Sequence, residues 1–160
     1  ENELRILRRA DPALNHDLPP FLARDPGLNS GLMLTQYTAA ALVADCKVLA
    51  HPASVDSIPT SGNQEDHVSM GWTAGLKLRR VVANVRRALA IEALCAAQAI
   101  DLRGPLRPGA AVAAVLDRVR EQVPPLDEDR YLAPDLAAVE HLVADGTLVA
   151  AAEEVAGPLG

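Results

Sequence analysis

The sequence predicts an all-α protein, with long central bundle helices followed by shorter C-terminal helices. Aliphatic and small side chains recur at helical spacing over long stretches, and no alternation typical of a β-strand persists anywhere. The 160 residues are 49% hydrophobic but only 2% aromatic. Because aromatic rings usually supply much of a core's buried area, Ala, Leu and Val must fill this core by close packing of helix against helix.

Charge and cysteine content exclude several classes of protein. With 15 Lys and Arg against 21 Asp and Glu, the net charge is −6, which argues against a nucleic acid or an anionic membrane as partner. Cys46 and Cys95 provide no disulfide framework and suit a reducing compartment. No stretch resembles an export signal or a membrane span. A cytoplasmic protein without a nucleic-acid or membrane partner is expected.

The first thirty residues (1–30) are expected to combine the end of a helix with a Pro-rich extended segment. Residues 4–9 (LRILRR) resemble the last turns of a helix that begins before Glu1, which indicates a piece of a longer protein. Four prolines between residues 11 and 26 exclude helix from most of that stretch.

Two long core helices are predicted within residues 31–104. The first covers residues 31–49, where small and aliphatic side chains occupy nearly the whole circumference, so this helix should be buried on most sides. An irregular loop at 50–66 follows, and a loop of this length is usually functional or disordered. Since its first half carries few charges, disorder is the weaker choice.

The second long helix is predicted to begin at Asp66, which would cap it, and to end near Leu102 before Gly104-Pro105. Beyond Ala88 it is apolar on nearly every side. A helix of this kind needs neighbours all round, and the chain has too few other helices to supply them. The pattern therefore predicts oligomerisation or a further part of the subunit.

The last third of the chain (105–160) is predicted to form shorter helices. Amphipathic stretches cover residues 109–123, 135–144 and 148–155, and prolines with acidic residues mark the loop between the first two.

Most chemistry-bearing patterns are weak or absent. Cys46, His51 and His67 lie near one another in the sequence but lack the spacing of metal ligands, so no metal site is predicted. Neither a nucleophile motif of the G-x-S-x-G type nor a phosphate-cradling loop occurs. A basic stripe runs along the second long helix without interleaved aromatic residues, which is more typical of a solvated or subunit-facing side than of a nucleic-acid site. The stripe comprises Lys77, Arg79, Arg80, Arg86 and Arg87.

Residues 63–67 (NQEDH) place an amide pair, a carboxylate pair and an imidazole in sequence at the predicted start of the second helix. Backbone capping would account for Asn63 and Asp66. It does not account for Glu65. From composition alone, the segment is either an elaborate helix cap or the wall of an active site.

Longer stretches around this segment resemble the histidine ammonia-lyases, a branch of the aromatic amino-acid lyase family. They are residues 27–33 (GLNSGLM), 36–42 (QYTAAAL), 51–61 (HPASVDSIPTS) and 63–71 (NQEDHVSMG), with further likeness at 19–22 and 87–92. The resemblance covers most of the chain, strongest over residues 19–104, and corresponds to the C-terminal third of such an enzyme. Within the family, the Gln-Glu-Asp-His form points to histidine rather than to phenylalanine or tyrosine.

The resemblance implies a mostly helical homotetramer whose active sites are assembled from several subunits. It implies non-oxidative loss of ammonia from L-histidine to give urocanate, assisted by a methylidene-imidazolone electrophile formed from an Ala-Ser-Gly tripeptide. It also implies that Glu65 lies beside the substrate imidazole as a catalytic and substrate-binding carboxylate, with Gln64 as a neighbouring substrate-binding amide. No residue of this chain is implied in cofactor or metal binding.

One departure from the family limits these expectations, because the chain contains no Ala-Ser-Gly. The chain alone is therefore expected to be inactive, and the electrophile should lie in the missing N-terminal part. Two alternatives stay open. One is a non-catalytic helical module for assembly or regulation that retains the lyase scaffold, and the other is a sister lyase or aminomutase acting on a different aromatic amino acid.

Overall fold

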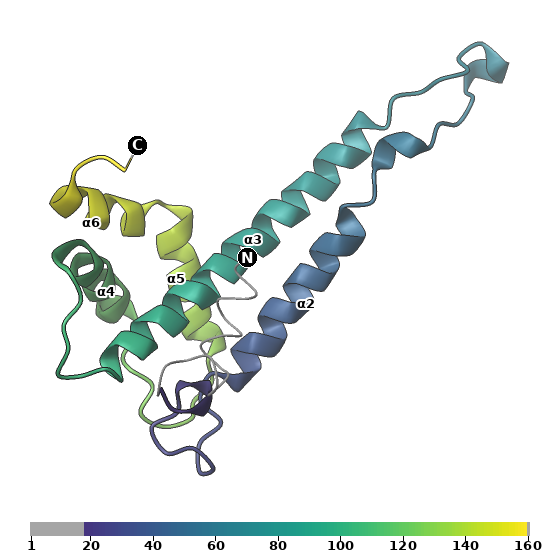
Figure 1. Ribbon diagram of the computed structural model, residues 1–160. Helices are drawn as coiled ribbons and strands as arrows, with labels where there is room; N and C mark the ends of the chain where they lie inside the picture. The colour runs from purple at the N-terminus through teal and green to yellow at the C-terminus, as the bar shows by residue number, and fades with distance from the viewer. Residues whose placement is uncertain (1–17, 160) are drawn as a thin grey trace.

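The computed structural model describes residues 18–159, and this part of the chain folds into helices and loops without a strand (Figure 1). The predicted all-α class is confirmed. The helix end predicted at residues 4–9 lies outside the described residues. The helices are α2 (Met33–Leu49), α3 (Gly71–Asp101), α4 (Ala110–Gln122), α5 (Ala133–Ala144) and α6 (Thr147–Ala156), with short 3-10 turns η1 (Pro20–Leu22), η2 (Ala53–Val55) and η3 (Ser61–Asn63).

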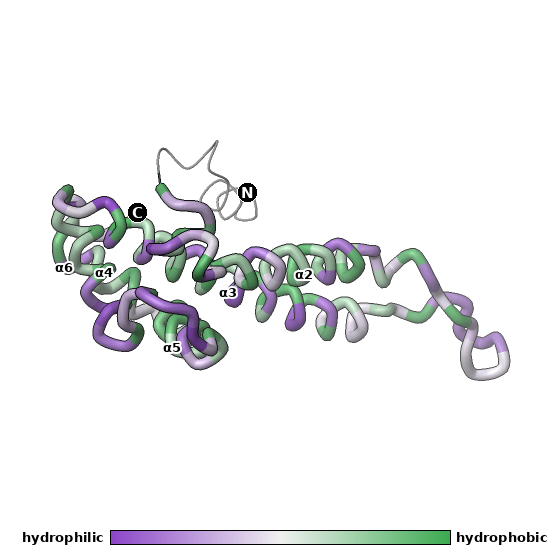
Figure 2. Tube along the Cα trace, turned by 90° about the horizontal axis from the view of Figure 1, so that it is seen from below, coloured by the Kyte–Doolittle hydropathy of each residue, from purple (hydrophilic) through white to green (hydrophobic). Residues whose placement is uncertain are grey.

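Helices α2 and α3 lie side by side as a long hairpin, and α4, α5 and α6 gather around the C-terminal end of α3 (Figure 1). The connection between α2 and α3 lies at the far end of the hairpin, away from these shorter helices in both views (Figure 2). The molecule therefore has a compact base, which holds α4–α6, and a projecting end, which holds the α2–α3 connection.

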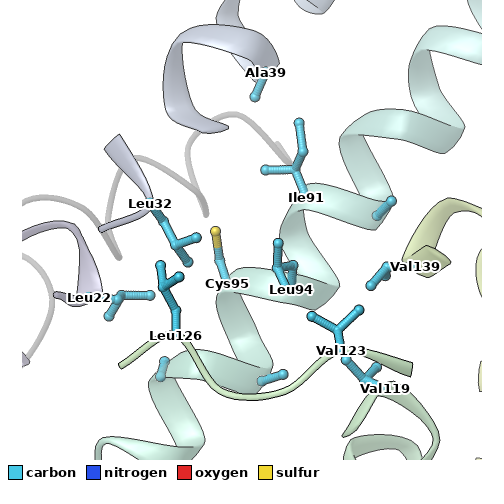
Figure 3. Packing of buried hydrophobic residues seen from close by; sticks show 13 residues of the cluster. Leu22, Leu32, Ala39, Ile91, Leu94, Cys95, Val119, Val123, Leu126 and Val139 are labelled. Atoms are coloured by element: carbon cyan, nitrogen blue, oxygen red, sulfur yellow. The ribbon is translucent and has the colours of Figure 1, made fainter. Parts of the chain in front are cut away.

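The core lies in the base and is centred on the second half of α3 (Figure 3). Ile91, Leu94 and Cys95 of α3 are buried, and they pack with buried side chains from five other parts of the chain. Those partners include Leu22, Leu32, Val119, Val123, Leu126 and Val139. The prediction that α3 beyond Ala88 needs neighbours from outside is thus wrong for most of this stretch, because the chain folds back to cover it.

Helix α2 differs from its prediction as well. Thr35, Ala39 and Leu49 are its buried residues, whereas Tyr37 and Val48 are 68% and 73% exposed. The predicted burial on most sides is wrong for this chain by itself, because α3 is the neighbour that covers α2 along its length. Apolar side chains on the remaining faces are left at the surface.

The start of α3 is the largest error in the predicted boundaries. The helix begins at Gly71, five residues beyond the predicted Asp66, and its N-cap is Met70 with no side-chain hydrogen bond. Asp66 does not cap the helix, because the residues before Gly71 are paired with the other side of the connection, as described below. Helix α5 begins two residues earlier than predicted, since Pro134 fits the first turn of a helix.

Polar groups tie the loop between α4 and α5 to α3 and to the residues just before α2. The buried Gln98 side chain accepts a hydrogen bond from the Leu126 amide and donates one to the Leu126 carbonyl, both at 2.9 Å. The Asp129 carboxylate accepts hydrogen bonds from the Ser30 and Gly31 amides at 2.8 and 2.9 Å. These two amide donors lower the pKa of Asp129 below its usual value.

Gly31 occupies a position in this region that only glycine fits. Its φ is +57°, and a Cβ atom there would lie 2.6 Å from the Phe21 carbonyl oxygen. Left-handed backbone combined with such a close approach requires the absence of a side chain. Within the described part of the chain, no helix has both the length and the apolar character needed to cross a membrane.

Candidate active-site arm

The connection between α2 and α3, residues 51–70, is a closed arm held by two sets of hydrogen bonds. Nearer the helices, the Val68 amide donates to the Ser57 hydroxyl at 2.8 Å, and that hydroxyl lies 3.3 Å from the Val68 carbonyl oxygen, to which it donates. Nearer the tip, the Thr60 amide donates to the Glu65 carbonyl oxygen at 2.9 Å, and the Glu65 amide donates to the Thr60 carbonyl oxygen at 3.3 Å. The arm is therefore a loop that contains one isolated antiparallel bridge, between Thr60 and Glu65.

The tip of the arm reverses the chain through three left-handed residues. Ser61, Gly62 and Asn63 have φ values of 51°, 62° and 70°. Glycine adopts this region freely, and asparagine more readily than most residues. The Gln64 amide donates to the Ser61 carbonyl oxygen at 3.2 Å and closes the turn. The sequence Gly62-Asn63 thus explains why the chain can turn back within four residues and bring Glu65 opposite Thr60.

Contacts between α2 and α3 fix the base of the arm. The Arg80 guanidinium and the Asn84 amide both donate to the Asp45 carboxylate, at 3.0 and 2.7 Å. The Lys77 ammonium donates to the carbonyl oxygen of His51, the first residue of the arm. Lys77 and Arg80 of the predicted basic stripe thereby hold the two helices together at the base of the arm. Arg87 of the same stripe pairs instead with Glu140 of α5, with 3.5 Å between Arg87 Nε and Glu140 Oε1.

Both predicted site residues lie at the end of the arm. Gln64 and Glu65 are exposed, as are Asp66 and His67. The Glu65 carboxylate accepts a hydrogen bond from the Thr60 hydroxyl, with 3.3 Å between Thr60 Oγ1 and Glu65 Oε2. The base, with its core, lies at the other end of the hairpin (Figure 1). The site residues are therefore presented outward by a pinned loop and are not enclosed by the described residues.

A cavity of about 630 Å³ occurs elsewhere, between the start of α2 and the segment that leads into α5. Its lining includes Leu34, Thr38, Tyr131 and Leu136. None of the predicted site residues lines it. Within residues 18–159, no group of three or more His, Cys, Asp or Glu side chains is arranged to hold a metal ion.

Two residues that hold the arm are not predicted from the sequence: Ser57, which acts through its hydroxyl, and Thr60, which acts through its backbone. The sequence does contain a signal for the pairing of Thr60 with Glu65, because Gly62 and Asn63, which lie between them, are turn-forming residues. The capping interpretation instead assigns Asn63 and Asp66 to backbone hydrogen bonds at the start of a helix, and so does not pair Thr60 with Glu65.

Comparison with known proteins identifies the class to which this fold and arm belong. The sequence model of the family described as "Aromatic amino acid lyase" matches residues 2–121. The chain belongs to the aromatic amino acid lyase family.

Within this family the chain is a homologue of the histidine ammonia-lyases. It is 62% identical over 157 residues to the histidine ammonia-lyase of Symbiobacterium thermophilum. This match covers 98% of the chain and 31% of the relative. The chain thus spans about a third of the length of the curated relative.

Solved structures agree with this assignment. The crystal structure of histidine ammonia-lyase from Trypanosoma cruzi superposes with a TM-score of 0.92 at 46% identity, over 96% of this chain and 30% of that one. The tyrosine aminomutase of Streptomyces globisporus superposes with a TM-score of 0.90 at 39% identity, over 96% and 29%. The α2–α3 hairpin and its surroundings are therefore a shared part of the lyase scaffold.

Proposed function

We propose that this chain supplies the acidic arm of a histidine ammonia-lyase, which removes ammonia from L-histidine without oxidation to give urocanate. The observation that carries the proposal is the placement of Gln64 and Glu65 at the exposed end of a pinned arm, in a chain 62% identical to a histidine ammonia-lyase. A carboxylate held outward in this way is available to a substrate bound between this chain and another part of the enzyme.

Glu65 is suited to recognise an imidazole. An ionised carboxylate accepts hydrogen bonds on both oxygens, and a bond from an imidazole N–H to a charged acceptor is stronger than one between neutral groups. Glu65 would thereby orient the substrate ring and accept or return a proton at one of its nitrogens. The Gln64 amide, with both donor and acceptor atoms, would line the same site.

The family's methylidene-imidazolone group supplies the electrophile that activates the substrate, and it forms from Ala-Ser-Gly. This chain offers no such tripeptide, so its own residues do not fit the formation of that group. The part assigned to this chain is confined to binding, orientation and proton transfer through Glu65 and Gln64. We accordingly propose that the 160-residue chain alone does not turn over histidine.

We further propose that the chain works in a homo-oligomer, a tetramer by resemblance, in the cytoplasm. Apolar side chains on the projecting half of α3 support the oligomer, since Trp72, Leu78 and Val82 are 82%, 61% and 48% exposed. Several large apolar side chains exposed on one helix are typical of an interface. The thiols of Cys46 and Cys95 are consistent with a reducing compartment.

The test is replacement of Glu65 in the complete enzyme. Glu65→Ala should lower turnover of histidine by a factor of roughly 10² or more, the scale of a lost acid or base group, because an alanine side chain neither accepts a hydrogen bond nor exchanges a proton. Urocanate absorbance measures the rate. Asp56→Asn, which alters another exposed carboxylate of the arm, is the matched control and should retain activity.

Two outcomes would contradict the proposal. Unchanged turnover in Glu65→Ala would remove the role assigned to that carboxylate. Urocanate produced by the purified 160-residue chain would show that this chain turns over histidine without an electrophile from another part of the enzyme.

A second candidate is an aminomutase, favoured by the structural similarity to the tyrosine aminomutase of Streptomyces globisporus. The greater identity to histidine ammonia-lyases makes it the weaker choice. Assays of the complete enzyme with histidine, tyrosine and phenylalanine separate the two. Release of urocanate from histidine supports the lyase, whereas a β-amino acid formed from tyrosine supports the aminomutase.

A further inference from the structure

The Thr60 side chain lies against the one carboxylate to which the proposed function assigns chemistry. Thr60 Oγ1 is 3.3 Å from Glu65 Oε2 and donates a hydrogen bond to it. Both residues are exposed, so packing does not hold the Glu65 side chain in place. The Thr60 hydroxyl is a polar group that the Glu65 carboxylate contacts directly.

The backbone explains why these two side chains meet. Thr60 and Glu65 exchange both amide–carbonyl hydrogen bonds, at 2.9 and 3.3 Å, which makes them directly opposed residues of an antiparallel pair. Side chains of opposed residues project from the same face of the pair. The turn at Ser61–Asn63 therefore sets the register that brings the Thr60 hydroxyl to the Glu65 carboxylate.

Threonine is suited to such a task. Its β-branched side chain has few χ1 rotamers, so the backbone pairing also restricts where the hydroxyl points. Glutamate by contrast has three rotatable bonds and loses considerable freedom when it is fixed. A stiff donor that holds Oε2 leaves Oε1 to accept a substrate N–H or a proton.

We propose that Thr60 is a positioning residue for Glu65, whose hydroxyl holds the carboxylate in the orientation needed to meet the substrate imidazole. The proposal rests on the proposed function, because it assigns to Thr60 an effect that acts through Glu65. It differs from a purely structural role, since the backbone pairing of residues 60 and 65 does not require the hydroxyl.

Two substitutions in the complete enzyme separate the hydroxyl from the rest of the side chain. Thr60→Val keeps the shape and the branching but removes the donor, whereas Thr60→Ser keeps the donor and removes the methyl group. Thr60→Val should lower kcat/KM for histidine by about tenfold, the lower end of the range for losing a partner that orients a functional ligand. Thr60→Ser should restore the rate to within about twofold of the unaltered enzyme.

A matched control addresses loss of any exposed hydroxyl. Thr38 also carries one, which donates to the Leu34 carbonyl oxygen at 2.9 Å on α2, far from the arm tip. Thr38→Val should leave kcat/KM unchanged. Equal rates in Thr60→Val and Thr60→Ser, whether both normal or both low, would overturn the proposal.

A double variant tests whether the effect passes through Glu65. When Glu65→Gln is already present, adding Thr60→Val should lower the residual rate by less than about twofold, because residues that act as a unit are not additive. A further tenfold loss would overturn the positioning role. If Glu65→Gln alone retained full activity, the proposed function itself would fail, and the two failures are thereby distinguished.

Discussion

The two ends of the α2–α3 hairpin have opposite characters. At the base, Ile91 and Gln98 of α3 are 1% and 2% exposed and lie among side chains from several other parts of the chain. At the projecting end of the same helix, Trp72 is 82% exposed, and the arm beyond it is held by its own hydrogen bonds. The base thus contains the stabilising contacts and the arm contains the candidate chemistry, so substitutions at the two ends should have separable effects.

The largest effect on stability is expected from a cavity in the base. Ile91→Ala should lower the free energy of unfolding by about 2–5 kcal/mol, because it removes a fully buried side chain from close-packed surroundings. Denaturant unfolding of the 160-residue chain measures it. Ile58→Ala, at a 64% exposed arm position, should cost less than about 0.5 kcal/mol. Similar costs at both positions would mean that the arm packs against the core.

A pair of glycine substitutions should change stability in opposite directions. Gly31→Ala should destabilise by about 1–3 kcal/mol from left-handed backbone alone, with a further cost because the new Cβ would lie 2.6 Å from the Phe21 carbonyl oxygen. Gly75→Ala, on the exposed part of α3 with no atom within 4 Å of its Cβ, should stabilise by about 0.5–1 kcal/mol. Melting temperatures of both variants test this contrast. A lower melting temperature in Gly75→Ala as well as in Gly31→Ala would contradict it.

The smallest effect should appear as a dependence on pH. Because the Ser30 and Gly31 amides lower the pKa of Asp129 in the folded chain, the ionised carboxylate stabilises folding above the unfolded-state pKa of about 3.9. This contribution is lost as pH falls through the lower folded-state pKa. Asp129→Asn should therefore be less stable than the unaltered chain at pH 7, and the difference should shrink below about pH 4.

Unfolding curves at several pH values measure that difference. Asp56→Asn, in the arm, is the control and should leave stability within about 0.5 kcal/mol at pH 7. A constant difference between Asp129→Asn and the unaltered chain from pH 7 to pH 3 would contradict the assigned role of the carboxylate.

Much of the fold could be predicted from the sequence. Helical periodicity placed α4, α5 and α6 to within two residues at each end, since prolines and glycines mark their boundaries. The start of α3 could not be placed in this way. Asp66 has the residue type of an N-cap, but the pairing of Ser57 with Val68 and of Thr60 with Glu65 across the arm keeps these residues out of the helix.

The candidate site was predicted in identity but not in geometry. Capping does not account for Glu65 in the sequence, and the resemblance implies a role for it that stays a prediction. The partnership with Thr60 was missed, since it depends on the register of the pairing across the turn. Which part of α3 is covered was also missed, because burial depends on where α4–α6 and residues 18–32 return.

The sequence by itself determined the helical class, most helix boundaries and the residues with chemical potential, because these follow from periodicity, turn residues and side-chain type within short windows. The tertiary structure decided which apolar surface is buried, because burial depends on residues far apart in the chain. It also decided which Glu65 carboxylate oxygen has a partner, because that depends on the register across the turn at Ser61–Asn63. Gln98 joined to Leu126, and Thr60 joined to Glu65, are the contacts in which this difference is clearest.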